Sequence, residues 1–234
     1  MRKLLCVGLL LSSGTGGHGL TLTTEESPPF NYSVDGGKTV VGSATQAIHE
    51  LFKRANMDYT ISLYPWVRAY KMAQTEADTC VFSTTRTEER EKSFVWVGPV
   101  ALNSWVLFAL ADSSIKLETL EDAKKYTIGG YRGDALTLFL KEQKFSIDEA
   151  YYDAQNPKKL SGGRIDLWAT GIQTGPFFAE QMKIGIKPVL RIKKTELYLA
   201  CNPAVAPETI ARLNAALQSM VKDGTTAKIF KKYQ

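Results

Sequence analysis

The sequence predicts an α/β fold in which mostly parallel strands alternate with helices. Strand, helix and strand patterns follow one another at 20–24, 43–56 and 59–64, and this βαβ order requires parallel strands. Later in the chain, at 127–135, another predicted strand is followed by a glycine and the start of a helix. At 234 residues, 44% of them hydrophobic and 23% charged, the chain can bury a sizeable core in one large domain or two small ones.

The N-terminus has the pattern of a signal peptide, predicted at 1–19. Two basic residues form a positive start, 4–11 is apolar, and 12–19 is small and polar, with cleavage expected near Gly19. The apolar stretch is too short to cross a bilayer. We therefore expect an exported, soluble protein whose mature chain begins near Leu20. A first core strand is the alternative, which the glycine-rich segment after the apolar stretch disfavours.

The first part of the chain after the predicted signal peptide, residues 20–83, contains three predicted strands and two predicted helices. The strand at 20–24 alternates in polarity and ends where Pro28 and Pro29 break the ladder, because proline cannot donate to a neighbouring strand. The helix at 43–56 carries its apolar residues on one face. A strand at 59–64 leads into the second helix.

Trp66 opens that second helix. It lies at a strand-to-helix junction, which is where open α/β sheets bind ligands. We interpret Trp66 as a ligand-contacting side chain, and a buried core tryptophan is the alternative.

Hydroxyl groups, free backbone N–H groups and a guanidinium come together after the third predicted strand, 79–83. Ser83 and Thr85 supply hydroxyls at its end. Thr87 stands at the N-cap position of a short helix, and Arg90 lies in that helix's first turn. Such a place binds an anion, above all a carboxylate. For Arg90, an ordinary arginine on the helix surface is the alternative.

The rest of the chain continues the α/β pattern. The predicted strands are at 94–97, 104–110, 127–130, 164–170, 187–192 and 196–201, and the predicted helices are at 135–144, 157–160, 173–182, 207–221 and 225–233. No repeat, linker or low-complexity segment interrupts them.

The charge pattern argues against several classes of protein. The net charge is +5, but the basic residues are scattered and cluster only in short lysine pairs. No arginine-rich arm and no basic helix interleaved with aromatic residues is present, so no nucleic-acid partner is expected. The histidines are His18 and His49, and no Cys-x-x-Cys occurs, so neither a metal site nor a cofactor is expected.

Ser-Thr-Thr-Arg-Thr-Glu-Glu-Arg at 83–90, followed by Phe-Val-Trp at 94–96 and Gly-Pro at 98–99, resembles one family. This family is the solute-binding proteins of bacterial polar amino-acid ABC transporters, the extracellular solute-binding proteins of family 3. Further matching motifs are Glu-Ser-Pro-Pro-Phe at 26–30, Gly-Asp-Ala at 133–135, Gly-Arg-Ile-Asp at 163–166 and Asp-Gly-Thr-Thr-Ala-Lys-Ile-Phe at 223–230. The resemblance covers 20–234, and it is more specific for the fold than for the ligand.

The resemblance implies the two-lobe periplasmic-binding-protein type II fold, with mostly parallel sheets flanked by helices. It places lobe 1 at 20–102 and 198–234 and lobe 2 at 103–197, joined by a two-strand hinge. It further implies a monomeric periplasmic protein that binds and does no chemistry. Its ligand would be a small carboxylate-bearing molecule, an amino acid or a related compound, and its partner would be the permease of an ABC importer in the membrane.

The resemblance also implies a ligand site in the cleft between the lobes. The arginine that matches Arg90 and the hydroxyl that matches Thr85 meet the ligand's carboxylate, and the aromatic that matches Trp66 stacks on its aliphatic part. The complete set of candidate ligand-binding residues is Arg90, Thr85, Trp66, Ser83, Asp134, Glu25, Ser27, Tyr131 and Thr170.

The amine of an amino-acid ligand lacks its usual partner in this chain. Family members hold it with an acid just beyond the strand that matches 164–170, but the sequence there is Ala169-Thr170-Gly171. Asp134 or Glu25 could serve instead. If neither serves, we expect a ligand other than an ordinary α-amino acid, because a buried ammonium without a partner is too costly.

Two alternative functions share the same cleft. Some proteins of this fold are dehydratases of cyclic carboxylates, and Asp134 or Glu25 could be the acid that protonates the leaving hydroxyl. Others pass their loaded form to a receptor and act as sensors.

Two cysteines remain after the signal peptide, Cys80 and Cys201. An exported protein meets oxidising conditions, and in the fold that the chain resembles the strands carrying them are neighbours in one sheet. Two alternatives therefore remain for this pair: a disulfide bond, or two buried free thiols.

Overall fold

The chain folds around one sheet of eight strands, in the order β4-β1-β5-β10-β6-β9-β7-β8. The computed structural model describes residues 19–233, so the predicted signal peptide lies outside the described residues except for Gly19. The strands are β1 (Leu20–Thr24), β2 (Tyr32–Ser33), β3 (Val40–Val41), β4 (Tyr59–Leu63), β5 (Thr79–Thr85), β6 (Val95–Leu110), β7 (Ile128–Tyr131), β8 (Ile147–Ala150), β9 (Leu167–Gly171) and β10 (Ile186–Cys201). β2 and β3 form a separate small hairpin.

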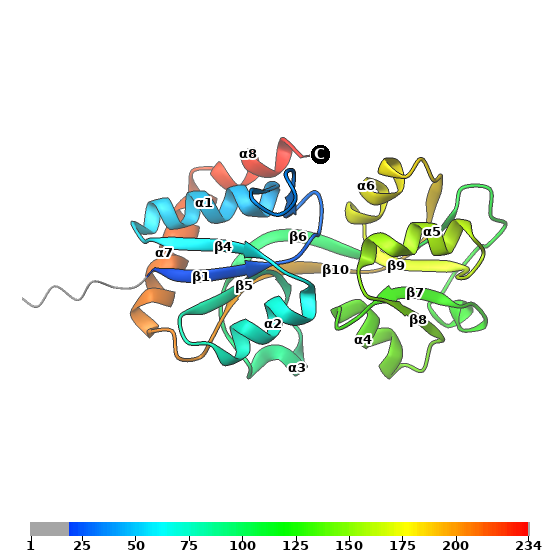
Figure 1. Cartoon of the computed structure of the whole chain (residues 1–234), viewed down its shortest axis with the longest axis horizontal. Helices are drawn as coiled ribbons and strands as arrows, with labels where there is room; N and C mark the ends of the chain where they lie inside the picture. Colours follow the sequence, from blue (N-terminus) through cyan, green and yellow to red (C-terminus); the bar gives the residue numbers. More distant parts are fainter. Residues whose placement is uncertain (1–18, 234) are drawn as a thin grey trace, which may run out of the picture.

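Helices cover this sheet at both of its ends (Figure 1). The α-helices are α1 (Ser43–Ala55), α2 (Trp66–Thr75), α3 (Glu88–Glu91), α4 (Ala135–Glu142), α5 (Asn156–Ser161), α6 (Thr174–Gln181), α7 (Pro207–Lys222) and α8 (Thr225–Lys231). Two 3₁₀ helices, η1 (Glu121–Lys125) and η2 (Asp153–Gln155), complete the list. None of the helices within residues 19–233 is both long enough and apolar enough to cross a membrane.

The strand pairings confirm the α/β class with a mostly parallel sheet. β4, β1 and β5 are parallel at one end of the sheet, and β9, β7 and β8 are parallel at the other. The strands in between, β10 and β6, pair with their neighbours in the antiparallel sense. In Figure 1 these two long strands run through the middle of the molecule and connect the two groups of elements.

The prediction of four short strands in this region was wrong. The predicted strands at 94–97 and 104–110 are one strand, β6, and those at 187–192 and 196–201 are one strand, β10. Each has 16 residues, because β6 and β10 pair with one another from Cys201↔Val95 to Ile186↔Leu110. The pairing with β10 continues on both sides of Gly98-Pro99 and shifts register there, between Leu199↔Val97 and Leu197↔Ala101, which no local pattern could indicate.

Four hydrophobic clusters pack against the sheet among residues 19–233, and the two largest lie at the two ends of the long strands. The first packs α1, α7 and α8 against β1 and β5, with Leu22, Phe52 and Leu213 fully buried. The second packs α4 against β7 and β9 and includes Leu140 and Leu167. Two cores joined by two strands agree with two lobes, while the predicted boundaries at 102/103 and 197/198 stay a prediction.

Cys80 and Cys201 lie opposite each other on β5 and β10, which are neighbours in the sheet. The structure joins them by a disulfide, and neither side chain is exposed. The bridge therefore ties the C-terminal end of the second long strand to the first core.

Candidate functional site

A small cavity lies where the loops of the two ends of the sheet meet. Its volume is about 50 Å³. Seven of the nine predicted site residues line it, namely Glu25, Ser27, Ser83, Thr85, Tyr131, Asp134 and Thr170. They come from the ends of β1, β5, β7 and β9, because the carboxyl ends of parallel strands deliver their loops to a common edge. We call this space the inner cavity.

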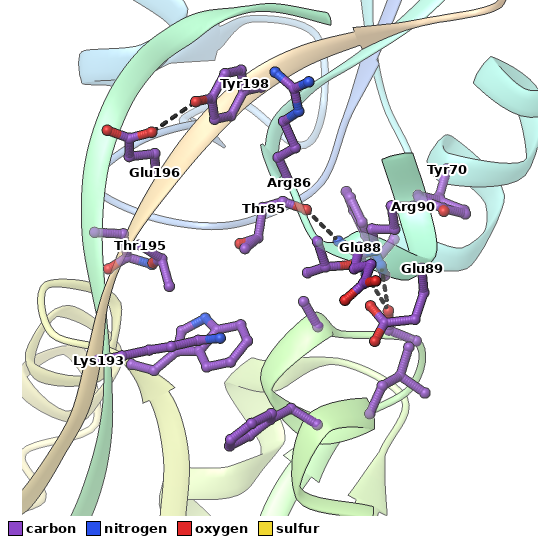
Figure 2. Close-up of a pocket in the computed structure, with 18 of the residues that line it drawn as sticks. Tyr70, Thr85, Arg86, Glu88, Glu89, Arg90, Lys193, Thr195, Glu196 and Tyr198 are labelled. Atoms are coloured by element: carbon purple, nitrogen blue, oxygen red, sulfur yellow. Dashed lines mark hydrogen bonds between the residues drawn. The ribbon is translucent and has the colours of Figure 1, made fainter. Parts of the chain in front are cut away.

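The other two predicted residues, Trp66 and Arg90, line a larger adjoining groove of about 1460 Å³, shown in Figure 2. We call this space the outer groove. Thr85, Asn103 and Trp105 line both spaces, so they meet at these three residues. The structure therefore divides the predicted site into a wide, open part around Arg90 and a narrow, enclosed part beyond it.

Arg90 is buried, with 6% of its surface exposed. Its Nη1 donates to the carbonyl of Thr85 at 3.1 Å and its Nη2 to the carbonyl of Gly133 at 3.0 Å (Figure 2). The guanidinium lies 5.4 Å from the ring centre of Trp66 and 5.1 Å from that of Tyr70. These contacts offset the cost of burying the charge. Because a guanidinium has five N–H donors, three remain for a ligand in the outer groove.

Trp66 also reaches across to Gly133, since its Nε1 donates to the same carbonyl at 2.8 Å. Gly133 has a φ of +75°, and a Cβ there would lie 3.3 Å from side-chain atoms of Trp66 and Val67. A glycine is therefore what allows the loop before α4 to approach α2 this closely. Trp66 faces Arg90 beside the outer groove, and its role in stacking on a ligand stays a prediction.

Glu25 and Tyr131 connect the two ends of the sheet inside the inner cavity. The hydroxyl of Tyr131 donates to Oε1 of Glu25 at 2.9 Å. Burial raises the pKa of the Glu25 carboxyl and that of the Tyr131 phenol well above their ordinary values. The contact therefore joins the loop after β1 to the end of β7 inside the inner cavity.

Asp134 is the N-cap of α4. Its Oδ2 accepts hydrogen bonds from the backbone N–H of Thr137 at 2.9 Å and from the Thr137 hydroxyl at 3.2 Å. Burial raises the pKa of this carboxyl, and its hydrogen bonds oppose the rise. These hydrogen bonds hold the Asp134 carboxyl at the N-terminus of α4, where it also lines the inner cavity.

Asp153 is a site residue that the sequence analysis missed. It is the first residue of η2, three positions after the end of β8, and it lines the inner cavity with only 6% of its surface exposed. Its Oδ1 accepts from Nε1 of Trp168 at 2.7 Å and from Nδ2 of Asn156 at 3.0 Å. Its Oδ2 accepts from the hydroxyl of Thr170 at 2.6 Å. Burial raises the pKa of Asp153 to about 6.

The only signal for Asp153 in the sequence is its position shortly after β8, and that strand was not predicted. β8 was not predicted, because its four residues, Ile-Asp-Glu-Ala, include two acids and no clear alternation. β8 forms as the edge strand beside β7, and its carboxyl end delivers Asp153 to the cleft. An acid at a strand's carboxyl end can be recognised only once the strand itself is known. Asn103, Trp105 and Thr174 also line the cavity and were missed.

Ser83 is held in a conformation that is unusual for a residue with a side chain, with a φ of +61°. Its hydroxyl donates to Oδ1 of Asn31, and Nδ2 of Asn31 donates to the carbonyl of Glu25 at 2.6 Å. Asn31 therefore ties the loop after β1 to the end of β5. This network positions the first-core side of the inner cavity.

The inner cavity is acidic. Glu25, Asp134 and Asp153 line it, and none of its lining residues is a lysine, an arginine or a histidine. Burial raises the pKa of Glu25 and of Asp134, and it outweighs the positive charge of Arg90, which lowers both. Among residues 19–233, no group of three or more His, Cys, Asp or Glu side chains is placed to hold a metal ion.

Burial of Asp153 leads to a testable dependence of stability on pH. Its folded-state pKa, about 6, is above the ordinary value of 3.8, so the protonated form favours the folded state. That stability is fully present below about pH 4 and is lost as the pH rises through 6, a change of roughly 3 kcal/mol. We expect the free energy of unfolding of Asp153→Asn, relative to the unmutated protein, to rise by roughly 2 kcal/mol of this total between pH 4 and 6.5.

The measurement is denaturant unfolding of both ligand-free proteins across this pH range. Glu25 and Asp134, whose pKa values are also raised, are present in both proteins, so the difference reports the Asp153 carboxyl together with its charge coupling to these two groups. A difference that does not change with pH would contradict the burial of a titrating carboxyl at this position.

Comparison with known proteins supports the architecture. A family model described as bacterial extracellular solute-binding proteins, family 3, matches residues 20–234. The chain is 26% identical over 247 aligned positions to the putative ABC transporter arginine-binding protein 2 of Escherichia coli (strain K12), covering 100% of this chain and 99% of that one.

Solved structures match across the described chain. A histidine kinase sensor domain with similarity to periplasmic binding proteins has a TM-score of 0.85 at 18% identity, covering 92% of this chain and 95% of that one. An ancestral arginine-binding protein bound to arginine has a TM-score of 0.78 at 22% identity, covering 92% and 97%. An ancestral amino acid-binding protein, a precursor of cyclohexadienyl dehydratase, has a TM-score of 0.79 at 21% identity, covering 92% and 94%. At these identities the structures show the fold alone.

Proposed function

The chain belongs to the bacterial extracellular solute-binding proteins of family 3, and from this membership we propose that it captures a small amino acid or related carboxylate and delivers it to an ABC importer. The protein would be exported, its signal peptide would be cleaved near Gly19, and the mature chain would act as a monomer in the periplasm. Its partner would be the permease in the membrane.

One observation carries the proposal: a buried guanidinium lies at the boundary between the two groups of elements and keeps free donors. Arg90 comes from the first group and already contacts Gly133 of the second. A carboxylate in the outer groove could accept from its remaining N–H groups and from the Thr85 hydroxyl, which lines the same groove. Charge-assisted hydrogen bonds from a guanidinium as buried as that of Arg90 offset part of the desolvation of a carboxylate.

Capture requires the two groups of elements to separate. The inner cavity of about 50 Å³ holds a few waters but no whole amino acid. Three hydrogen bonds cross the cleft here, from Arg90 and Trp66 to Gly133 and from Tyr131 to Glu25. We propose that these contacts break on opening, and that β6 and β10 act as the hinge.

A screen by thermal shift tests this function. The mature, ligand-stripped protein would be heated with amino acids, small carboxylates and oligopeptides. A ligand at about a thousand times its dissociation constant adds roughly 4 kcal/mol. For a chain of this size each kcal/mol raises Tm by about 2–4 °C, so we expect a shift of about 8–16 °C with the correct ligand class. The absence of any shift across the whole panel would contradict the proposed function.

A dehydratase is the second candidate, favoured by the partly buried carboxyl of Glu25 in the inner cavity. Burial raises its pKa, so it can hold the proton that a general acid must deliver. Incubation with prephenate or arogenate distinguishes the two functions, because only the enzyme forms product. For the sensing alternative, the genomic neighbourhood is informative: a permease and an ATPase beside the gene favour transport, whereas an isolated gene favours a receptor.

A further inference from the structure

The outer groove stays wide although the two groups of elements already touch across the cleft. Arg90 and Trp66 of the first group donate to the carbonyl of Gly133 in the second. The rings of Tyr32 and Phe177, again one from each group, lie 5.3 Å apart. The groove beside these contacts still has a volume of about 1460 Å³, against about 50 Å³ for the inner cavity. The greater part of a ligand that binds at Arg90 would therefore lie in the outer groove.

Two helices, one from each group, present one face each to this groove. Residues at spacings of three and four share a helix face, and the groove-lining residues follow such spacings on α2 and on α4. They are Trp66, Val67, Tyr70, Lys71 and Gln74 on α2, and Ala135, Leu138, Phe139 and Glu142 on α4. On both helices the lining residues near the N-terminus are apolar or aromatic, and the polar ones come later. The walls of the groove are therefore apolar at one end and polar at the other.

Exposed apolar side chains gather in this groove. Val67, Leu102 and Leu138 line it with 48%, 68% and 48% of their surfaces exposed. They are three of the seven large hydrophobic side chains that are exposed among residues 19–233, and they come from three separate elements, α2, β6 and α4. Single exposed apolar residues are ordinary, whereas several around one hollow indicate a binding surface.

The apolar end of the groove begins beside the guanidinium of Arg90. That guanidinium lies 5.1 Å from the ring centre of Tyr70, and Figure 2 shows the two side chains next to each other. Its second partner, the carbonyl of Gly133, comes two residues before the start of α4. Since a helix rises about 1.5 Å for each residue, Glu142 lies about 10 Å further along α4 than Ala135. A carboxylate on Arg90 would thus have an apolar channel of limited length in front of it.

We propose that the outer groove is a subsite for an apolar group attached to the ligand's carboxylate. The carboxylate binds Arg90, and the apolar group lies between α2 and α4, against Val67, Leu102 and Leu138. This inference rests on the proposed function and names the ligand's class, a carboxylate with an apolar group of limited length. Amino acids with apolar side chains and alkyl or aryl carboxylates without an amine share this chemistry.

Two series of probes test the subsite by titration calorimetry. One consists of straight-chain carboxylates from acetate through butanoate and hexanoate to decanoate. The other consists of glycine, L-alanine, L-leucine and L-phenylalanine. In at least one series we expect each added methylene to raise the affinity about twofold to fourfold, because it leaves water for the groove. The gain should stop once the chain reaches the polar end of the groove. The series that shows the gain identifies whether the ligand carries an amine.

The double variant Leu102→Gln/Leu138→Gln makes the test specific for the groove. Both side chains are exposed and glutamine is similar in size to leucine, so we expect the variant to fold. Its affinity for the longer probes should fall about tenfold relative to its affinity for the shortest probe of the same series. Val221→Gln is the matched control, because Val221 is exposed on α7 and lies outside both spaces. It should bind every probe like the unmutated protein.

Glu142→Leu tests the proposal by a gain of affinity, which a folding defect cannot imitate. Glu142 is exposed at the end of α4 and lines the polar end of the groove. A leucine there lengthens the apolar wall by about one turn of the helix. We therefore expect the gain in affinity to continue to longer chains than in the unmutated protein.

The possible failures are distinguishable. Equal affinity for short and long probes would overturn the apolar subsite, leave the proposed function standing and assign the exposed side chains to contact with another protein. A gain with chain length that is unchanged in the double variant and in Glu142→Leu would place the apolar group elsewhere and also overturn the subsite. If no probe binds and the wider screen of amino acids and carboxylates is also blank, both the subsite and the proposed function fail.

Discussion

Arg90→Ala is expected to weaken the binding of a carboxylate ligand by about a hundredfold or more while the protein still folds. Arg90 is a buried guanidinium of the cleft with donors left over for a ligand, and removing one partner of a buried charge pair costs about 2–5 kcal/mol. The fold should survive because Trp66 still donates to the carbonyl of Gly133. Affinity is measured by calorimetry with whichever carboxylate the screen identifies.

Two further variants test whether the loss of affinity depends on the guanidinium of Arg90 itself. Arg90→Lys should also bind more weakly, because a point charge cannot replace a planar fork that reaches two carbonyls and a ligand at once. Arg68→Ala is the matched control, since Arg68 is exposed and packs on Tyr64 at 4.1 Å, outside both spaces of the site. Unchanged affinity in Arg90→Ala would show that the carboxylate binds elsewhere.

Reduction of the bridge between Cys80 and Cys201 is expected to lower the free energy of unfolding by about 2–5 kcal/mol. The two residues are 121 positions apart, so opening the bridge frees a long loop in the unfolded chain. At 2–4 °C for each kcal/mol, Tm should fall by about 4–20 °C. Denaturant unfolding with and without a reductant measures the change.

The double variant Cys80→Ala/Cys201→Ala should reproduce this loss without any reductant. It also adds the cost of two small cavities, because neither cysteine is exposed. Thiol titration of the oxidised, denatured mature protein provides the chemical check. Two titratable thiols would contradict the bridge, and equal stability with and without reductant would contradict its expected contribution.

Local patterns were sufficient for most of the fold. β1, α1 and β4 were predicted nearly to their observed ends, because polarity repeats with the period of each element. The family resemblance was also correct, as the match over residues 20–234 confirms. The patterns failed at β6, β8 and β10. Partners distant in sequence decide these strands, because they join the predicted segments into the continuous strands β6 and β10 and hold β8 at the edge of the sheet.

The candidate site divides in the same way. Arg90 and Thr85 belong to one short motif after β5, so the sequence could place them together. Asp153 depends on an edge strand and on donors from β9 and α5, and no motif links these elements. Its importance as an acid follows only from its burial, which a sequence does not record.

The sequence by itself therefore determined the α/β class, the family and the motif that holds Arg90, because these depend on periodicity and on residues close together in the chain. Only the tertiary structure decided that the cleft has an outer groove beside a guanidinium and an inner cavity of three carboxyls. The physical reason is that desolvation and the balance of charge depend on which side chains the folded chain brings together, and Glu25, Asp134 and Asp153 come from three separate segments.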